Sequence, residues 1–214
     1  MQIIRFADLK PQPWSNGGGV TRELASHSGG TSAGTAAAED GAWDWRVSIA
    51  DVTSAGEYSA FPGMERVLTV IEGELLLLAV NGTEHPLEKY RPFRFPGGAA
   101  SSSALPTGDV RNLNVIAREG AFKAYTSIIE LSKKRAHPVF AGQLGILLQG
   151  QATVSTGNAG SPGNGGPDAG SGAAPDGAPV PLGRYDAVAG SDSETPEILG
   201  RGFLAVVSID PVTG

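Results

Sequence analysis

Apolar and polar residues alternate along most of this chain, which is the period of a β-strand whose two faces meet different surroundings. From position 43 the odd residues Trp43, Trp45, Val47 and Ile49 are large and apolar, whereas the even residues between them are polar or small. The same texture predicts further strands over Val67–Ile71, Leu75–Val80, Phe93–Phe95, Leu113–Ala117, Phe122–Glu130, Ile146–Leu148, Ala152–Ser155 and Phe203–Ile209.

Turn signals separate these strands, and no segment keeps a helical period over the length of a typical helix. The turns are predicted at Phe61-Pro62-Gly63, Glu72-Gly73, Asn81-Gly82, Pro96-Gly97-Gly98 and Gln149-Gly150. Many short strands with turns between them predict an all-β fold, either a barrel or a sandwich.

A faint internal repeat favours the barrel. Residues 70–77 and 147–154 both read as two apolar residues, a polar residue, glycine, the same polar residue and then a small or apolar run. Each copy is followed by a similar apolar strand, at 114–117 and at 204–207. Two strand-turn-strand hairpins in the same order predict a duplicated barrel, with one barrel over residues 1–120 and the other over 121–214.

Two low-complexity segments interrupt the strands. Ser26–Ala42 and Ser155–Leu182 consist almost wholly of small and polar residues, with no Lys or Arg and almost no bulky apolar group. Such segments cannot bury enough surface to offset the entropy of ordering. We therefore expect two mobile surface loops inserted in a compact fold, at 26–42 and at 155–182.

Charge and composition exclude several classes of protein. The 214 residues include 22 acidic and 16 basic side chains, a net charge of −6 that argues against a nucleic-acid-binding surface. The short basic run Lys133-Lys134-Arg135 is interpreted as a solvated turn. The sequence contains no cysteine, which excludes disulfides, thiolate zinc sites and cysteine nucleophiles. No apolar run is long enough for a membrane span or a signal peptide, so we expect a cytoplasmic protein.

The three histidines are too scattered to suggest a metal site. They stand at positions 27, 85 and 137, whereas metal-dependent β-barrels of the cupin type present two closely spaced His followed by a Glu and another His. We expect neither a bound metal nor a cofactor.

Three groups of residues are candidates for ligand binding. The glycine run after Trp14 and Asn16 either lines a ligand site or forms a bulged edge strand with the tryptophan as a plug. Arg46 and Ser48 fall on the polar face of their strand, and an arginine inside a barrel needs a carboxylate from the protein or from a ligand. Glu65 and Glu23 are the candidate protein partners. Asn112 and Asn114 also share one face of a strand, where they bond to each other or to a ligand.

Three segments resemble the HutD/Ves family: PWSNGGGVTREL, WDWRVSIADVTSAGEYSAFPGMERVLTVIEGEL and NLNVIAR. The resemblance covers residues 1–119, whereas the second half matches only in architecture. It implies a bicupin, which is two double-stranded β-helix barrels in one chain, and a metal-free protein that binds a small carboxylate and modulates histidine utilisation. It also implies that the pocket lies near Trp14, Asn16, Gly18, Thr21, Arg22, Glu23, Arg46, Ser48, Phe61, Glu65 and Arg66.

One position departs from the family pattern. Relatives often have an aspartate where this chain has Asn112. The substitution removes a negative charge from the expected pocket, which implies either easier binding of anions or a different ligand.

Three functions remain open at this point. The first is a sensor in which Arg22 or Arg46 anchors a small carboxylate such as urocanate or formylglutamate. The second is a metal-independent isomerase or hydrolase with Glu65 or Glu23 as the general base. The third is an interaction scaffold whose barrel is filled by its own side chains and whose outer sheet faces form a homodimer.

Overall fold

The computed structural model describes residues 1–28, 43–156 and 178–212. The loops expected over Ser26–Ala42 and Ser155–Leu182 lie mostly outside the described residues, although residues 26–27, 155–156 and 180–182 belong to strands. Within the described part, the single helical element is a 3₁₀ turn, η1 (Phe6–Asp8), and no helix there is long and apolar enough to cross a membrane.

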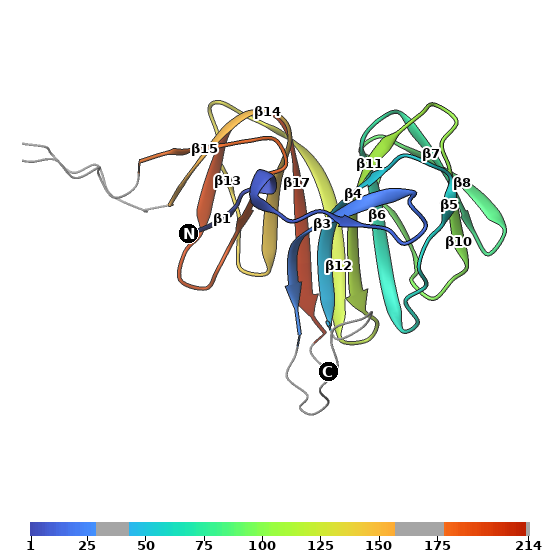
Figure 1. Cartoon of the computed structure of the whole chain (residues 1–214). Helices are drawn as coiled ribbons and strands as arrows, with labels where there is room; N and C mark the ends of the chain where they lie inside the picture. Colours follow the sequence, from blue (N-terminus) through green and yellow to red (C-terminus); the bar gives the residue numbers. More distant parts are fainter. Residues whose placement is uncertain (29–42, 157–177, 213–214) are drawn as a thin grey trace, which may run out of the picture.

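Antiparallel strands form two barrels that stand side by side (Figure 1). The N-terminal barrel combines two sheets. The six-stranded sheet has the order β2 (Gln12–Pro13), β3 (Gly19–His27), β4 (Trp45–Val52), β11 (Val110–Arg118), β6 (Met64–Glu72) and β9 (Phe93–Pro96). The four-stranded sheet has the order β5 (Gly56–Glu57), β10 (Ser101–Ala104), β7 (Leu75–Val80) and β8 (Thr83–Glu88).

The C-terminal barrel is built on one seven-stranded sheet. Its main path is β1 (Gln2–Ile4), β16 (Ala187–Ala189), β14 (Gln143–Thr156), β17 (Pro196–Pro211) and β12 (Phe122–Leu131). Two short strands complete it, with β13 (His137–Pro138) paired to β17 and β15 (Val180–Leu182) paired to β14.

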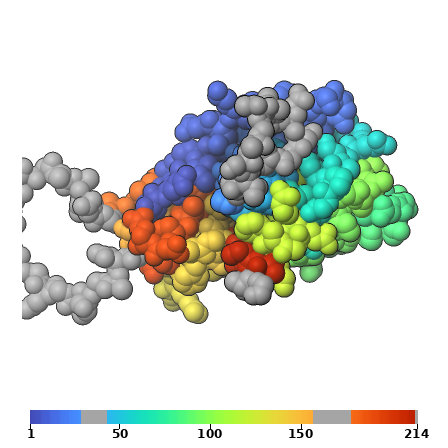
Figure 2. All heavy atoms as spheres, turned by 90° about the horizontal axis from the view of Figure 1, so that it is seen from below, coloured from blue at the N-terminus to red at the C-terminus, as the bar shows by residue number. Residues whose placement is uncertain are grey.

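Strand β1 belongs to the C-terminal sheet although it opens the chain. It pairs with β16, and Asp186 fixes the residues that follow by accepting bonds from Arg5 Nη1 (2.6 Å) and the Phe6 amide (3.0 Å). Figure 2 shows the blue N-terminal residues reaching from the cyan and green barrel to the orange residues of the other one. The C-terminal barrel therefore comprises residues on both sides of the expected boundary at 120.

The internal repeat corresponds to a structural duplication, but the hairpins predicted for it are wrong. Strands β6 and β7 lie in different sheets, and the turn at Gly73 (φ +85°) carries the chain from one sheet to the other. In the second copy the chain stays within one sheet as a single continuous strand, β14, with a bulge after Leu147 and a positive φ at Gly150. The true hairpin is at Asn81-Gly82, where both residues have positive φ between the paired strands β7 and β8, as a type I′ turn requires.

The two barrels share one apolar core. Val47 and Ile49 of β4 and Val115 of β11 pack outward from the first barrel against residues such as Ile146 and Val207 of the second. A separate aliphatic cluster occupies the C-terminal barrel, with Leu147, Val154, Val188, Ile198, Leu204 and Val206 among its members. The polar residues that alternate with the outward-packing positions of β4 and β11 are thereby turned into the N-terminal barrel.

Candidate ligand-binding site

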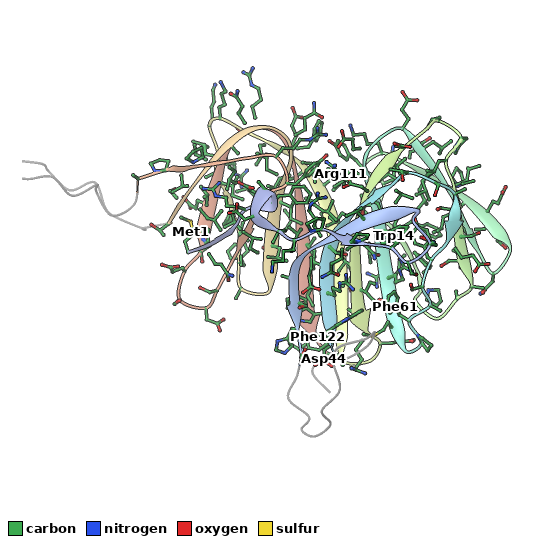
Figure 3. The ribbon with its side chains drawn as sticks, viewed as in Figure 1. Met1, Trp14, Asp44, Phe61, Arg111 and Phe122 are labelled. Atoms are coloured by element: carbon green, nitrogen blue, oxygen red, sulfur yellow. The ribbon has the colours of Figure 1, made fainter. Side chains whose placement is uncertain are left out.

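A polar cavity of about 210 Å³ occupies the N-terminal barrel. Figure 3 shows Trp14 and Phe61, two of its aromatic lining residues, both on this barrel. The full lining is Gln12, Pro13, Trp14, Ser15, Asn16, Thr21, Arg46, Ser48, Ala50, Glu57, Tyr58, Ser59, Phe61, Arg66, Asn112, Asn114 and Ile116.

Sheet register arranges the lining in rows across β4, β11 and β6. One row consists of Arg46, Ile116 and Arg66. Ser48 and Asn114 pair in the next row, and Ala50 and Asn112 in the one after. Every second residue over 46–50 of β4 and 112–116 of β11 therefore projects into the cavity, while the residues between them pack against the other barrel. From β6 only Arg66 lines the cavity.

Arg66 is the most deeply buried charge in the cavity, with 2% of its surface exposed. Its guanidinium lies between three aromatic rings, 5.3 Å from the centre of Tyr58, 5.6 Å from Phe61 and 5.1 Å from Phe95. Nη1 donates one bond to the Ser59 carbonyl (3.2 Å), and Nε has no hydrogen-bond partner in the part of the chain that the structure describes. No ion pair among the described residues includes Arg66.

Burial lowers the pKa of Arg66 to about 10, so the side chain still carries its positive charge at neutral pH. Taking an unpaired charge out of water costs several kcal/mol, and cation–π contacts return only about 0.5–2 kcal/mol each. A bound anion would supply the missing counter-charge.

Other buried polar atoms of the lining also make no hydrogen bond of normal geometry with the described residues, although Ser103 and Asn112 lie near enough to the Tyr58 hydroxyl to act on its pKa. These atoms are the Tyr58 hydroxyl, Asn112 Nδ2 and Asn114 Oδ1. Burial also raises the pKa of Tyr58, which keeps its hydroxyl protonated and able to donate. An unsatisfied buried polar group costs about 1–3 kcal/mol, so this cavity is suited to a ligand with its own donors and acceptors.

Arg46 supplies a second guanidinium, and this one has a carboxylate neighbour. Its Nε lies 3.1 Å from Glu23 Oε2, and its guanidinium carbon lies 5.8 Å from the centre of the Trp43 ring. Glu23 is in turn held by Ser26, whose hydroxyl donates to Glu23 Oε1 (2.7 Å). The charge of Arg46 is therefore compensated from within the protein.

The structure brings most of the predicted residues together around the cavity. These are Trp14, Asn16, Thr21, Arg46, Ser48, Phe61, Arg66, Asn112 and Asn114. Four predicted residues do not line it, namely Gly18, Arg22, Glu23 and Glu65.

The expectation that Arg22 anchors a ligand in the barrel does not fit its position. Thr21 lines the cavity, so its neighbour Arg22 projects from the opposite face of β3. There its Nη1 donates to Asp51 Oδ2 (2.9 Å), and its guanidinium lies 5.2 Å from the centre of the Phe6 ring.

Neither carboxylate considered as a general base reaches into the cavity. Glu65 forms an ion pair with Arg94, which also donates to the Ala124 carbonyl on β12. Glu23 is paired with Arg46. The one carboxylate in the lining is Glu57, an exposed residue outside the motifs that indicated the candidate site.

The glycine run after Trp14 lies beside the cavity lining and not in a bulged edge strand. A Cβ on Gly19 would lie 2.4 Å from the Asp51 carbonyl oxygen and 3.1 Å from the Trp14 ring, so only glycine fits there. The bulge of β3 lies between Glu23 and Ala25, beyond the glycine run, and β3 is paired with β2 and β4 on its two sides, so the glycines do not form a bulged edge strand. Trp14 lines the cavity, with Nε1 donating to Thr21 Oγ1 (2.8 Å). Gly18 contributes to the cavity only indirectly, because its amide donates a hydrogen bond to Oδ1 of the lining residue Asn16 (2.9 Å).

Some lining residues were missed although a signal for them existed. Ala50 and Ile116 continue the alternation that indicates Arg46, Ser48, Asn112 and Asn114, but they carry no polar group and so give no sign of ligand binding. Tyr58 and Ser59 lie between strands, where no periodicity predicts the direction of a side chain. As for metals, no group of three or more His, Asp or Glu side chains suited to an ion occurs in the described ranges.

Two packed β-barrels from one chain, with a polar cavity inside the first, define a bicupin, as the resemblance to the HutD/Ves family implied. Solved cupin proteins share this architecture at sequence identities below 25%, a likeness that concerns the fold alone. The HutD family model matches residues 6–204, and the chain therefore belongs to the HutD family.

Relatives and a solved structure agree with this assignment. The Protein Ves of Citrobacter koseri is 32% identical over 150 residues, which are 68% of this chain and 72% of that protein. A Pseudomonas putida protein described as an uncharacterized 21.2 kDa protein in the hutC 3′ region is 35% identical over 125 residues, 58% of this chain and 62% of its own. The structure of HutD from Pseudomonas fluorescens SBW25 is 26% identical with a TM-score of 0.70, and the match covers 99% of both chains.

Proposed function

We propose that this protein binds a small carboxylate metabolite in its N-terminal barrel, with Arg66 as the anchor, and that binding modulates histidine utilisation. The observation that carries the proposal is the guanidinium of Arg66, buried at the cavity wall with no carboxylate partner among the described residues. A cytoplasmic location is part of the same proposal.

The chemistry of the lining supports a carboxylate. Arginine presents a planar fork of donors that matches the two oxygens of a carboxylate, and the unpartnered Asn112 Nδ2 and Tyr58 hydroxyl add neutral donors. The rings of Trp14 and Phe61 offer apolar surface to the body of the ligand. A cavity of about 210 Å³ suits a small acid such as urocanate or formylglutamate.

The link to histidine utilisation rests on family membership and on the printed description of the Pseudomonas putida relative, which places that protein beside hutC. The open cavity favours ligand binding over a scaffold, whose barrel would be filled by its own side chains. The ion pairs of Glu65 and Glu23 outside the lining favour binding over catalysis by either residue.

Calorimetric titration tests the proposal directly. Urocanate, formylglutamate and histidine are titrated into the purified chain, and we expect saturable binding of at least one acid that Arg66→Met abolishes. Arg22→Met is the matched control, because it removes a guanidinium outside the cavity and leaves Asp51 its second partner, Arg111. Three flat titrations up to millimolar concentration, or equal losses in both variants, would contradict the proposal.

A further inference from the structure

The cavity has two guanidiniums in one row of the sheet. Arg46 on β4 and Arg66 on β6 are both paired with Ile116 of the intervening strand β11, and both line the cavity. Two strand spacings separate their Cα atoms by about 10 Å. By position alone, this row could receive two carboxylates of one ligand.

The two arginines differ in their surroundings. Arg66 has no carboxylate partner among the described residues, whereas Arg46 Nε lies 3.1 Å from Glu23 Oε2. At neutral pH the row therefore offers one uncompensated positive charge. The second charge is already balanced by an acidic residue that stands outside the lining.

A β-bulge holds Glu23 at this place. The register of β3 against β4 shifts between Glu23 and Ala25, which brings Ser26 opposite Arg46. Ser26 Oγ then donates to Glu23 Oε1 at 2.7 Å. Without the bulge Ala25, which has no hydroxyl, would face Arg46.

The contact between Glu23 and Arg46 balances charge without satisfying the donor. Arg46 Nε is fully buried, and although it lies at ion-pair distance from Glu23 it makes no hydrogen bond of acceptable geometry. The Glu23 side chain retains 36% exposure. Arg46 Nε can therefore donate to a ligand carboxylate once the charge of Glu23 is removed.

We infer that Glu23 is a specificity-determining residue, which neutralises Arg46 and makes the cavity prefer ligands with a single carboxylate; this inference rests on the proposed function. Of the two acids named there, it favours urocanate, with one carboxylate, over formylglutamate, with two. A monocarboxylate at Arg66 leaves the Glu23 pair intact. A second carboxylate would have to displace Glu23 from Arg46 and would also approach the acidic Glu57 in the lining. Repulsion between the second carboxylate and the acidic side chains of Glu23 and Glu57 disfavours the binding of a dicarboxylate.

The experiment compares two acids with the same four-carbon unsaturated skeleton, crotonate with one carboxylate and fumarate with two. Each is titrated calorimetrically into the full chain at pH 7.5 and constant ionic strength. We expect the wild-type chain to bind crotonate at least about tenfold more tightly than fumarate. In Glu23→Gln, fumarate gains about tenfold through a charge-assisted contact with Arg46, and crotonate changes little.

Glu65→Gln is the matched control. It makes the same change of charge at another glutamate paired with an arginine, Arg94, outside the cavity lining. We expect it to alter neither affinity. Ser26→Ala is a second variant that keeps every charge and frees Glu23 from its hydroxyl anchor, and it should shift the preference toward fumarate by a smaller factor.

The outcomes separate this inference from the function on which it rests. If Arg66→Met abolishes crotonate binding but neither Glu23→Gln nor Ser26→Ala changes the ratio of the two affinities, the role of Glu23 is refuted and the carboxylate site stands. The role of Glu23 is also refuted if Glu65→Gln raises the affinity for fumarate as much as Glu23→Gln does. Tighter binding of fumarate than of crotonate by the wild-type chain refutes it as well. If the wild type binds no carboxylate at all, both proposals fall.

Discussion

The hydroxyl of Tyr185 in the C-terminal barrel donates a 2.7 Å hydrogen bond to Glu72 Oε2 at the end of β6 in the N-terminal barrel. The Tyr185 ring lies 4.8 Å from the guanidinium carbons of both Arg111 and Arg184, and each of these arginines also pairs with Glu72. Figure 3 shows Arg111 between the two barrels. This cluster joins the barrels through polar contacts beside their shared apolar core.

Tyr185→Phe should lower the free energy of unfolding by about 1 kcal/mol, because it removes one hydrogen bond to a charged group and keeps the ring. Carboxylate affinity should stay unchanged, since Tyr185 does not line the cavity. Chemical denaturation and calorimetry measure the two effects. A double-mutant cycle with Glu72→Gln should give a coupling energy above about 0.5 kcal/mol, and additivity would disprove a contribution from this bond.

Arg66→Met should leave the free energy of unfolding of the ligand-free chain within about 1 kcal/mol of the wild type. Truncating a fully buried side chain ordinarily costs about 2–5 kcal/mol, but here the variant also relieves the burial of an unpaired charge. Methionine keeps most of the volume between the three rings. Arg66→Ala is the comparison, since it leaves a void and should destabilise the chain. A large loss in Arg66→Met would mean that the aromatic contacts outweigh the desolvation of the charge.

Carboxylate affinity should be level from pH 6 to pH 9 and fall as the pH passes about 10. Burial lowers the pKa of Arg66 to about 10, and only the protonated guanidinium attracts an anion. A bound anion stabilises the protonated form, so the affinity decreases by up to about tenfold per pH unit above that pKa. Titrations at pH 7, 9 and 10.5 check this, with circular dichroism as the control for folding. An unchanged affinity at pH 10.5 would count against Arg66 as the anchor.

Asp186→Asn should destabilise the chain by about 1–3 kcal/mol at pH 7, with the difference shrinking below about pH 4. Burial acts to raise the pKa of Asp186, but hydrogen bonds from Arg5 and from the amides of Phe6 and Gly183 outweigh it and lower that pKa. A carboxylate with a lowered folded-state pKa stabilises the fold above its unfolded pKa, near 3.9, and loses that effect as the pH falls through its folded pKa. Urea unfolding at pH 7 and pH 3 measures both values, and an equal difference at the two pH values would contradict the assignment.

The alternation of residues in β4 and β11 predicted much of the site. The odd positions Val47 and Ile49 do pack outward, and Arg46 and Ser48 do enter the barrel. Strand period determines such orientations locally, which is why the sequence suffices for them.

Other features depend on contacts that the sequence does not express. Arg22 carries the same charge as Arg46 and lies in a family motif, but one step along β3 turns it to the opposite face. Arg66 is the buried cation because it lies among the rings of Tyr58, Phe61 and Phe95, which are separate in the sequence and meet only in the fold. The crossing at Gly73 resembled a hairpin because a bend between sheets and a turn within one sheet need the same positive φ.

The placement of β1 has a consequence for dissecting the protein. Because Gln2–Ile4 pair with Val188 and its neighbours, a fragment that starts at residue 121 would expose the backbone donors and acceptors of β16 along an open edge. Such edges recruit strands from other molecules and promote aggregation. The two halves are therefore not separable modules, and a cut between them should yield an insoluble C-terminal piece unless a peptide covering the first few residues is supplied in trans.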